Sequence, residues 1–94
     1  MTNMGTMFSG ASTFDQDLSR WNTANVTDMA GMFERALVFN QDLSLWKTSN
    51  VTDMGDMFRN TAAFDQEIRG WDVSKVTNFT NMFDGATAFA ATYG

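Results

Sequence analysis

A step of 25 residues recurs along the whole chain and constrains its fold more than any other feature. Trp21, Trp46 and Trp71 are equally spaced, and the large apolar residues between them keep the same step without an insertion or deletion. A repeat of this length cannot bury its own hydrophobic face, so neighbouring repeats must stack on one another. The spacing therefore predicts an α/β solenoid of about four superimposable coils.

The tryptophans divide the chain into coils at residues 21–45, 46–70 and 71–94, preceded by a partial coil at 1–20. These coils form a single repeat domain over residues 1–94. Four complete coils would need 100 residues, and neither end carries a polar capping repeat of the kind that solubilises such arrays. We therefore expect the chain to be part of a longer array.

The predicted core consists of columns that stay apolar in every coil. All eight methionines, nine phenylalanines and three tryptophans fall in these columns. The columns are Met1/Val26/Val51/Val76, Met4/Met29/Met54/Phe79, Met7/Met32/Met57/Met82, Phe8/Phe33/Phe58/Phe83, Phe14/Phe39/Phe64/Phe89, Leu18/Leu43/Ile68/Tyr93 and Trp21/Trp46/Trp71. A cofactor pocket could also use sulfur and aromatic groups, but unbroken columns favour interior packing, and no cofactor is expected.

Within one coil, Met29, Met32, Phe33 and Ala36 have the i, i+3, i+4, i+7 spacing of a helix face. This spacing predicts a short helix in each coil, with a threonine such as Thr27 at its N-cap. The residues around 42–44 alternate in polarity and predict a short strand stacked on its counterparts. One helix and one strand per coil give an LRR-like architecture with a parallel sheet along the axis.

Composition excludes several classes of function. The chain has no cysteine and no histidine, which removes thiolate chemistry, the commonest general base and the commonest metal ligand. Six scattered bases against eleven acids give a net charge of −5, the wrong sign for a nucleic-acid-binding surface. No apolar run approaches the roughly 18 residues of a membrane span, and residues 1–10 do not resemble a signal peptide.

The repeated string F-[DN]-Q-[DE]-[LI]-x-x-W-x-[TV]-[AS]-[NK]-V-T-[DN]-[MF]-x-x-M-F resembles the repeat of the BspA-like leucine-rich-repeat surface proteins. The resemblance covers essentially the whole chain and implies an LRR-like module displayed outside the cell or on its surface. Some members of that family act as adhesins, and it implies no catalytic residues. The C-terminal residues 89–93 lose the Asx-Gln-acid row, so the last coil is expected to be irregular.

Acidic side chains align between coils and raise the question of a metal site. Stacked carboxylates repel each other, and a hard cation such as Ca²⁺ would relieve that repulsion. The candidate ligands are Asp15, Asp17, Asp42, Asp65 and Glu67. Alternatively these acids face solvent or accept backbone hydrogen bonds. A glycosidase pair would need unlike environments for its two carboxylates, which a repeat does not provide, so we expect no enzyme activity.

Positions that break the repeat point to a partner. Leu37, Val38 and Leu45 of the second coil stand where other coils have Ser, Thr, Ala, Arg or Gly. With Ala62 and Ala63 they form a candidate apolar patch for a protein or cell-surface ligand. Scattered surface hydrophobic residues without a role are the simpler alternative.

Two functions follow as hypotheses. The first is a non-enzymatic recognition or adhesion module, displayed on a cell surface, that binds a macromolecular partner. The alternative is a structural repeat protein in which copies of the chain assemble head to tail through uncapped solenoid ends. Ice binding by threonine columns is a more distant possibility, because Val73 interrupts the row of Thr23 and Thr48.

Overall fold

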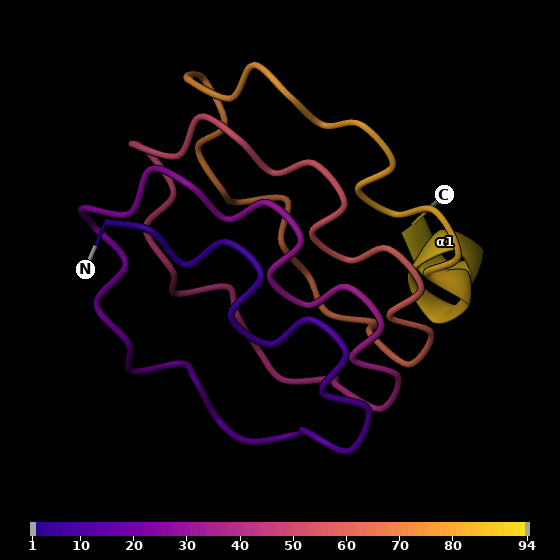
Figure 1. Cartoon of the computed structure of the whole chain (residues 1–94). Helices are drawn as coiled ribbons and strands as arrows, with labels where there is room; N and C mark the ends of the chain where they lie inside the picture. The colour runs from indigo at the N-terminus through magenta and orange to yellow at the C-terminus, as the bar shows by residue number, and fades with distance from the viewer. Residues whose placement is uncertain (1, 94) are drawn as a thin grey trace.

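The 25-residue step is the register in which neighbouring coils contact each other. The structure is a computed structural model and describes residues 2–93. The amide of Thr27 donates to the carbonyl of Thr2, that of Thr52 donates to Thr27, and that of Thr77 donates to Thr52, each over 2.8 Å. The chain consequently winds in successive turns that lie side by side (Figure 1). Met1, which was assigned to the valine column, lies outside the described residues.

The segment from residue 29 to 36 is a series of tight turns and not a helix. Met32, Glu34 and Ala36 each donate an N–H to the carbonyl three residues earlier. The amides between them point to the next coil: Gly31, Phe33 and Arg35 donate to Gly55, Met57 and Arg59 over 2.8–2.9 Å. The same alternation of local and inter-coil bonds is present in the equivalent segments of the first and third coils, whereas the segment of the last coil has only the local bonds.

The prediction of one helix per coil is therefore wrong. The helical spacing of Met29, Met32 and Phe33 does put these three side chains in the interior, where all are fully buried. A helix, however, uses its backbone groups internally and would leave none for the adjacent coil. The turns use half of the amides for inter-coil bonds. Thr27 caps no helix, and its hydroxyl donates to Thr2 O over 3.3 Å.

The predicted strand at 42–44 and the parallel sheet are wrong as well. The amide of Ser44 donates to Asp42 Oδ1 over 2.8 Å, and the amide of Trp46 donates to Leu43 O over 3.1 Å. These local bonds bend the chain where a strand was expected. Within residues 2–93, β pairing is limited to isolated parallel bridges, which join Asn3 to Asp28, Asp28 to Asp53, and Asp53 to Asn78.

The α/β solenoid of LRR-like architecture is thus not the fold of this chain. Across residues 2–93 there is one short helix and no β-strand beyond the isolated bridges. The molecule measures 28 × 24 × 20 Å. A leucine-rich repeat would need a continuous parallel sheet on one side. Here alternating turn bonds interrupt every run of inter-coil bonds, so the coils contact each other without forming a sheet.

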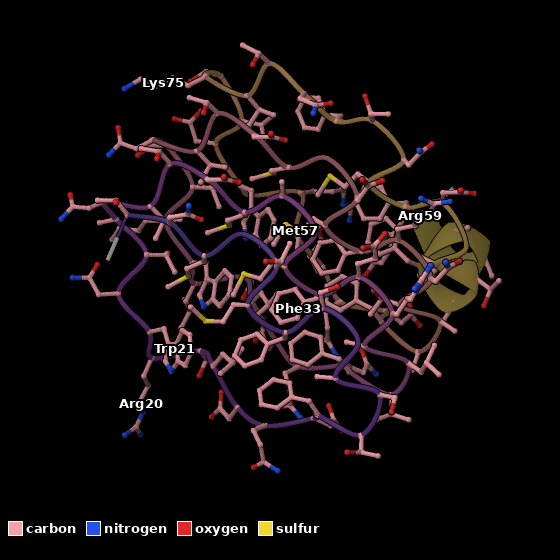
Figure 2. All side chains as sticks on the ribbon, in the orientation of Figure 1. Arg20, Trp21, Phe33, Met57, Arg59 and Lys75 are labelled. Atoms are coloured by element: carbon pink, nitrogen blue, oxygen red, sulfur yellow. The ribbon has the colours of Figure 1, made fainter. Side chains whose placement is uncertain are left out.

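Aromatic side chains stack along the interior from coil to coil. Phe8, Phe33, Phe58 and Phe83 form one column with ring centroids 5.6, 5.6 and 5.7 Å apart and nearly parallel planes. A second column, of Phe14, Phe39, Phe64 and Phe89, stacks beside it, with 4.2 Å between rings of the same coil. Phe33 and Met57 lie in the interior, whereas Arg20 and Lys75 point outward (Figure 2).

The tryptophan column is held by hydrogen bonds as well as by stacking. The indole N–H of Trp46 donates to Leu18 O, and that of Trp71 donates to Leu43 O, both over 2.9 Å. The two rings lie 6.4 Å apart and nearly parallel. A buried indole needs such an acceptor, so these bonds fix the register of consecutive coils.

The one helix of the described chain, α1, spans Thr87–Tyr93 at the C-terminal side (Figure 1). It has no buried residues, although Phe89 stays in the aromatic column, 5.9 Å from Phe64. The loss of the Asx-Gln-acid row at 89–93 predicted an irregular last coil, and this is where the helix forms. Over residues 2–93, no helix has the length and apolarity needed to cross a membrane.

Candidate partner-binding groove

A groove of about 590 Å³ runs across the coils. Its lining comes from two columns of the repeat, 25 residues apart at each step. The lining residues are Gly10, Arg35, Asn60 and Gly85 in one column and Ser12, Leu37 and Ala62 in the other. The repeat thus places equivalent positions of four coils along one continuous surface. We call this surface the 10–85 groove.

The first column has an unusual backbone conformation. Gly10, Arg35, Asn60 and Gly85 have φ angles of 75°, 62°, 59° and 77°. Each is the third residue of a turn such as Phe33–Ala36, where the Ala36 N–H donates to Phe33 O, and a positive φ at this position is typical of type II turns. A Cβ at Gly85 would collide with Asn60 Oδ1. A Cβ at Gly10 would have nothing within 4 Å, so there only the positive φ favours glycine.

Arg35 and Asn60 adopt this left-handed conformation without being glycine. Such a conformation costs a residue with a Cβ about 1 kcal/mol or more, less for asparagine. Inter-coil bonds hold it: Arg35 N donates to Arg59 O over 2.9 Å, and Asn60 N donates to Asp84 O over 2.8 Å. The backbone at Arg35 and Asn60 is consequently held from two directions, by the turn and by the neighbouring coil.

The apolar part of the groove comes from the second and third coils. Leu37 is 48% exposed and Val38 is 47% exposed, while Ala62 and Ala63 are partly buried. The amide of Ala63 donates to Leu37 O over 3.3 Å, which joins the second and third coils here. Four of the five predicted patch residues thus lie at or next to the groove.

Leu45 is not part of this surface. It is 74% exposed and lines a separate groove of about 410 Å³ together with Trp46, Lys47, Gly70 and their neighbours. The structure therefore separates Leu45 from Leu37 and Val38.

Charges beside the groove are partly compensated. Arg59 lies between Glu34 and Asp84, with nitrogen–oxygen distances of 3.9 and 3.7 Å, and its Nε has no hydrogen-bond partner in the described chain. Arg35 is exposed, and within residues 2–93 no carboxylate lies within 4 Å of its guanidinium. The groove therefore offers one uncompensated positive charge next to an apolar surface.

Four of the five acids proposed as calcium ligands accept hydrogen bonds, whereas Asp65 Oδ1 has no hydrogen-bond partner in the described chain. Asp15 Oδ1 accepts from Asn40 N over 2.9 Å and from Gln41 Nε2 over 3.0 Å. Asn40 Oδ1 accepts in the same way from Asp65 N and Gln66 Nε2, both over 2.9 Å. These bonds form an amide ladder from coil to coil.

The outer acids bend the chain locally. Asp17, Asp42 and Glu67 each accept the N–H two residues ahead, from Ser19, Ser44 and Arg69, over 2.7–2.8 Å. Bonds from the hydroxyl and amide of Ser44 hold the pKa of Asp42 below its ordinary value, and Ser19 does the same for the pKa of Asp17. The pKa of Glu67 is lowered mainly by the Arg69 side chain. Among residues 2–93, no three acidic side chains gather into a group that could hold a metal ion.

Sequence reasoning did not identify Arg35, Asn60, Gly10 and Gly85 as groove residues. The signal was present, because a column with glycine in two coils and asparagine in a third is typical of a left-handed position. It was overlooked because the predicted helix would have placed residue 35 at regular helical angles. The apolar substitutions at 37 and 38 were visible because they broke a repeat that is otherwise polar or small there.

Comparisons with known proteins add a family but no function. Neither a curated protein nor a solved structure was found to match the chain. A family model described as "Mycoplasma protein of unknown function, DUF285" matches residues 1–94. This match and the unbroken 25-residue repeat extend over the same residues, and the chain therefore belongs to the DUF285 family.

Proposed function

We propose that this chain is a non-enzymatic recognition module that binds a protein partner in the 10–85 groove. The observation that supports it most directly is the exposure of Leu37 and Val38, each close to one half, beside a groove of about 590 Å³. The backbone of Leu37 is already held by the bond from the Ala63 amide, so ordering it on binding would cost little entropy. Recognition therefore agrees with the geometry better than catalysis does.

The chemistry of the groove indicates what kind of segment fits. Leu37 and Ala62 offer apolar contact, and Arg35 offers a guanidinium with no nearby carboxylate in the described chain. A carboxylate would pair with Arg35 by a charge-assisted hydrogen bond. The partner segment is therefore an extended peptide that places an apolar side chain on Leu37 and an acidic side chain beside Arg35.

We further propose that the module acts on a cell surface. Its resemblance to the BspA-like surface proteins, some of which are adhesins, supports display on a cell surface and a role in adhesion. Antibody labelling of intact cells of the source organism, compared with permeabilised cells, tests this placement. Labelling only after permeabilisation would contradict it.

A peptide library displayed on phage and panned on the purified chain tests the groove. Selected peptides are expected to combine an apolar and an acidic residue, and to lose binding to two variants, Arg35→Glu and Leu37→Ser with Val38→Thr. Leu45→Ser is the matched control, because Leu45 is exposed but lies in a different groove. Peptides that bind all variants equally, or selection without any enrichment, would overturn the proposal.

A further inference from the structure

Two edges of the molecule carry complementary rows of backbone groups. In each internal coil-to-coil contact, four amides of one coil donate to four carbonyls of the next, for example Met29 N to Asp53 O over 3.0 Å. The trailing edge consists of the equivalent amides of Phe79, Asn81, Phe83 and Gly85. The leading edge consists of the equivalent carbonyls of Asn3, Gly5, Met7 and Ser9.

Within residues 2–93, the four trailing-edge amides have no acceptor. The leading-edge carbonyls of Asn3, Met7 and Ser9 have no donor in the same range, and that of Gly5 accepts only the neighbouring Thr6 hydroxyl over 2.7 Å. A row of unpaired amides in register is a template for pairing with another chain. The leading-edge carbonyls stand at positions of the repeat that accept such amides inside the molecule, so their spacing matches that of the trailing-edge amides.

Side chains at the two edges are also compatible. Phe79 is 47% exposed at the trailing edge and, with Trp71, Met82 and Phe83, lines an apolar hollow of about 260 Å³. Met7 is 37% exposed at the leading edge, next to Phe8. The phenylalanine column repeats at 5.6–5.7 Å inside the molecule, so Phe8 of another copy would continue it beyond Phe83.

The charge pattern removes one obstacle to this contact. The bridge residues Asp28 and Asp53 are acidic in the two inner coils, but the corresponding edge residues are Asn3 and Asn78. Edge-to-edge contact would place the two asparagines together and would add no pair of like charges. Stacked carboxylates at this position would instead weaken it.

We propose that the trailing edge of one copy of this chain binds the leading edge of a second copy, with the amides of Phe79, Asn81, Phe83 and Gly85 donating across the junction. The contact is heterologous, because two different surfaces meet, and it can therefore repeat into a filament. This inference uses neither Leu37 nor Arg35 and does not depend on the proposed groove function.

Sedimentation velocity of the purified 94-residue chain over a concentration series is the first measurement. The weight-average sedimentation coefficient is expected to rise with concentration without reaching the plateau of a closed dimer. Phe79→Lys blocks the trailing edge and Met7→Lys blocks the leading edge, and each variant alone is expected to associate at least about tenfold more weakly, because a charge would be buried. Leu45→Lys adds the same charge away from both edges and should associate like the original chain.

Mixing the two blocked variants is the decisive step. Each retains one intact edge, so an equimolar mixture is expected to form 1:1 dimers and nothing longer. If like edges met instead, one blocked variant would dimerise by itself and mixing would add nothing. A chain that stays monomeric at all concentrations would also overturn the proposal.

A milder variant tests the same contact in case the lysine variants do not fold. Asn3→Asp with Asn78→Asp recreates at the junction the acidic pair that the inner coils tolerate, and leaves the core unchanged. Its association is expected to be weaker at low salt and to recover as salt screens the two charges. Association that does not depend on salt in this variant would contradict the edge contact.

Discussion

Residues 39–43 of the second coil and residues 89–93 of the last coil are equivalent by the repeat but differ in structure. The first segment has no regular secondary structure: Asn40 N donates to Asp15 Oδ1 over 2.9 Å, and the Gln41 side chain donates to the same oxygen. In the last coil the second segment belongs to α1, where Ala90 N donates to Ala86 O over 3.0 Å. Phe39 and Phe89 nevertheless stack in the same column.

The comparison shows that the polar side chains, and not the aromatic ones, decide the backbone here. Ala91 stands where the other coils have glutamine and cannot donate to the preceding coil. Ala90 N is used within the helix, and Asp65 Oδ1, its expected acceptor, is left buried without a hydrogen-bond partner in the described chain. Without the amide ladder the alanines follow their own preference for helix.

The largest expected effect separates the centre of the aromatic columns from their end. Phe58 is fully buried and stacks with Phe33, Phe64 and Phe83. Phe58→Ala is expected to lower the free energy of unfolding by about 3–5 kcal/mol, because it leaves a cavity that rigid coils cannot close. Phe89→Ala, at the half-buried end, should cost only about 1–2 kcal/mol. Urea titrations of both variants measure this, and equal losses would contradict the comparison.

A smaller loss is expected when an inter-coil bond is removed from the tryptophan column. Trp46→Phe deletes the indole N–H that donates to Leu18 O, and this carbonyl then keeps only its bond from the Trp21 amide. The expected cost is about 0.5–1.5 kcal/mol in the free energy of unfolding. Trp21→Phe is the control, because Trp21 is 38% exposed and its indole donates to no residue within 2–93. If Trp21→Phe lost as much stability as Trp46→Phe, the effect would come from lost packing and not from the lost hydrogen bond.

One substitution should convert the last coil toward the conformation of the others. Ala91→Gln supplies the amide that the ladder lacks, so the introduced side chain would donate to Asp65 Oδ1 and α1 would unwind. The helical circular dichroism signal is expected to fall while stability rises by about 0.5–1.5 kcal/mol. Ala91→Glu is the matched control: it has the same size and helix propensity but no amide donor, and it should keep α1. Identical spectra for the two variants would argue against the ladder.

The smallest expected effect is a loss of stability in acid. It comes from the bends at Asp42 and Asp72 and not from α1. The pKa of Asp42 is lowered by the Ser44 hydroxyl and amide, and the pKa of Asp72 by the Ser74 amide and hydroxyl. Because these folded pKa values lie below the ordinary value of 3.8, the stabilisation is complete above pH 3.8 and is lost as pH falls through the lower folded values.

Thermal melts between about pH 7 and about pH 2.5 cover this range and measure the dependence. Asp42→Asn keeps an acceptor but cannot titrate, so its melting temperature should fall slightly less in acid than that of the original chain. The helical signal of α1 before melting is expected to be unaffected, since Thr87–Tyr93 contains no acidic side chain. A steeper acid loss in Asp42→Asn would show that the sign of the effect is wrong.

Much of the packing could be predicted from the sequence, whereas the backbone could not. The columns of Phe, Met and Trp specify which side chains are interior in the two inner coils, because burial follows from hydrophobicity and spacing. Spacing alone does not distinguish a helix from a series of turns, because both place an apolar side chain in the interior every three or four residues. Residues 29–36 were therefore assigned to the wrong element. The apolar groove residues were visible as repeat breaks, but the placement of Leu45 in another groove was not.

The sequence by itself determined the register of this protein, since one step of 25 residues leaves a single way to superimpose Trp46 on Trp71 and Phe33 on Phe58. It also determined the irregular last coil, where the ladder residues are missing. Only the tertiary structure decided how the backbone is used. An amide can donate within its own coil or to the next one, and that choice depends on whether a neighbouring coil offers a carbonyl at the right distance. Local sequence does not contain this information.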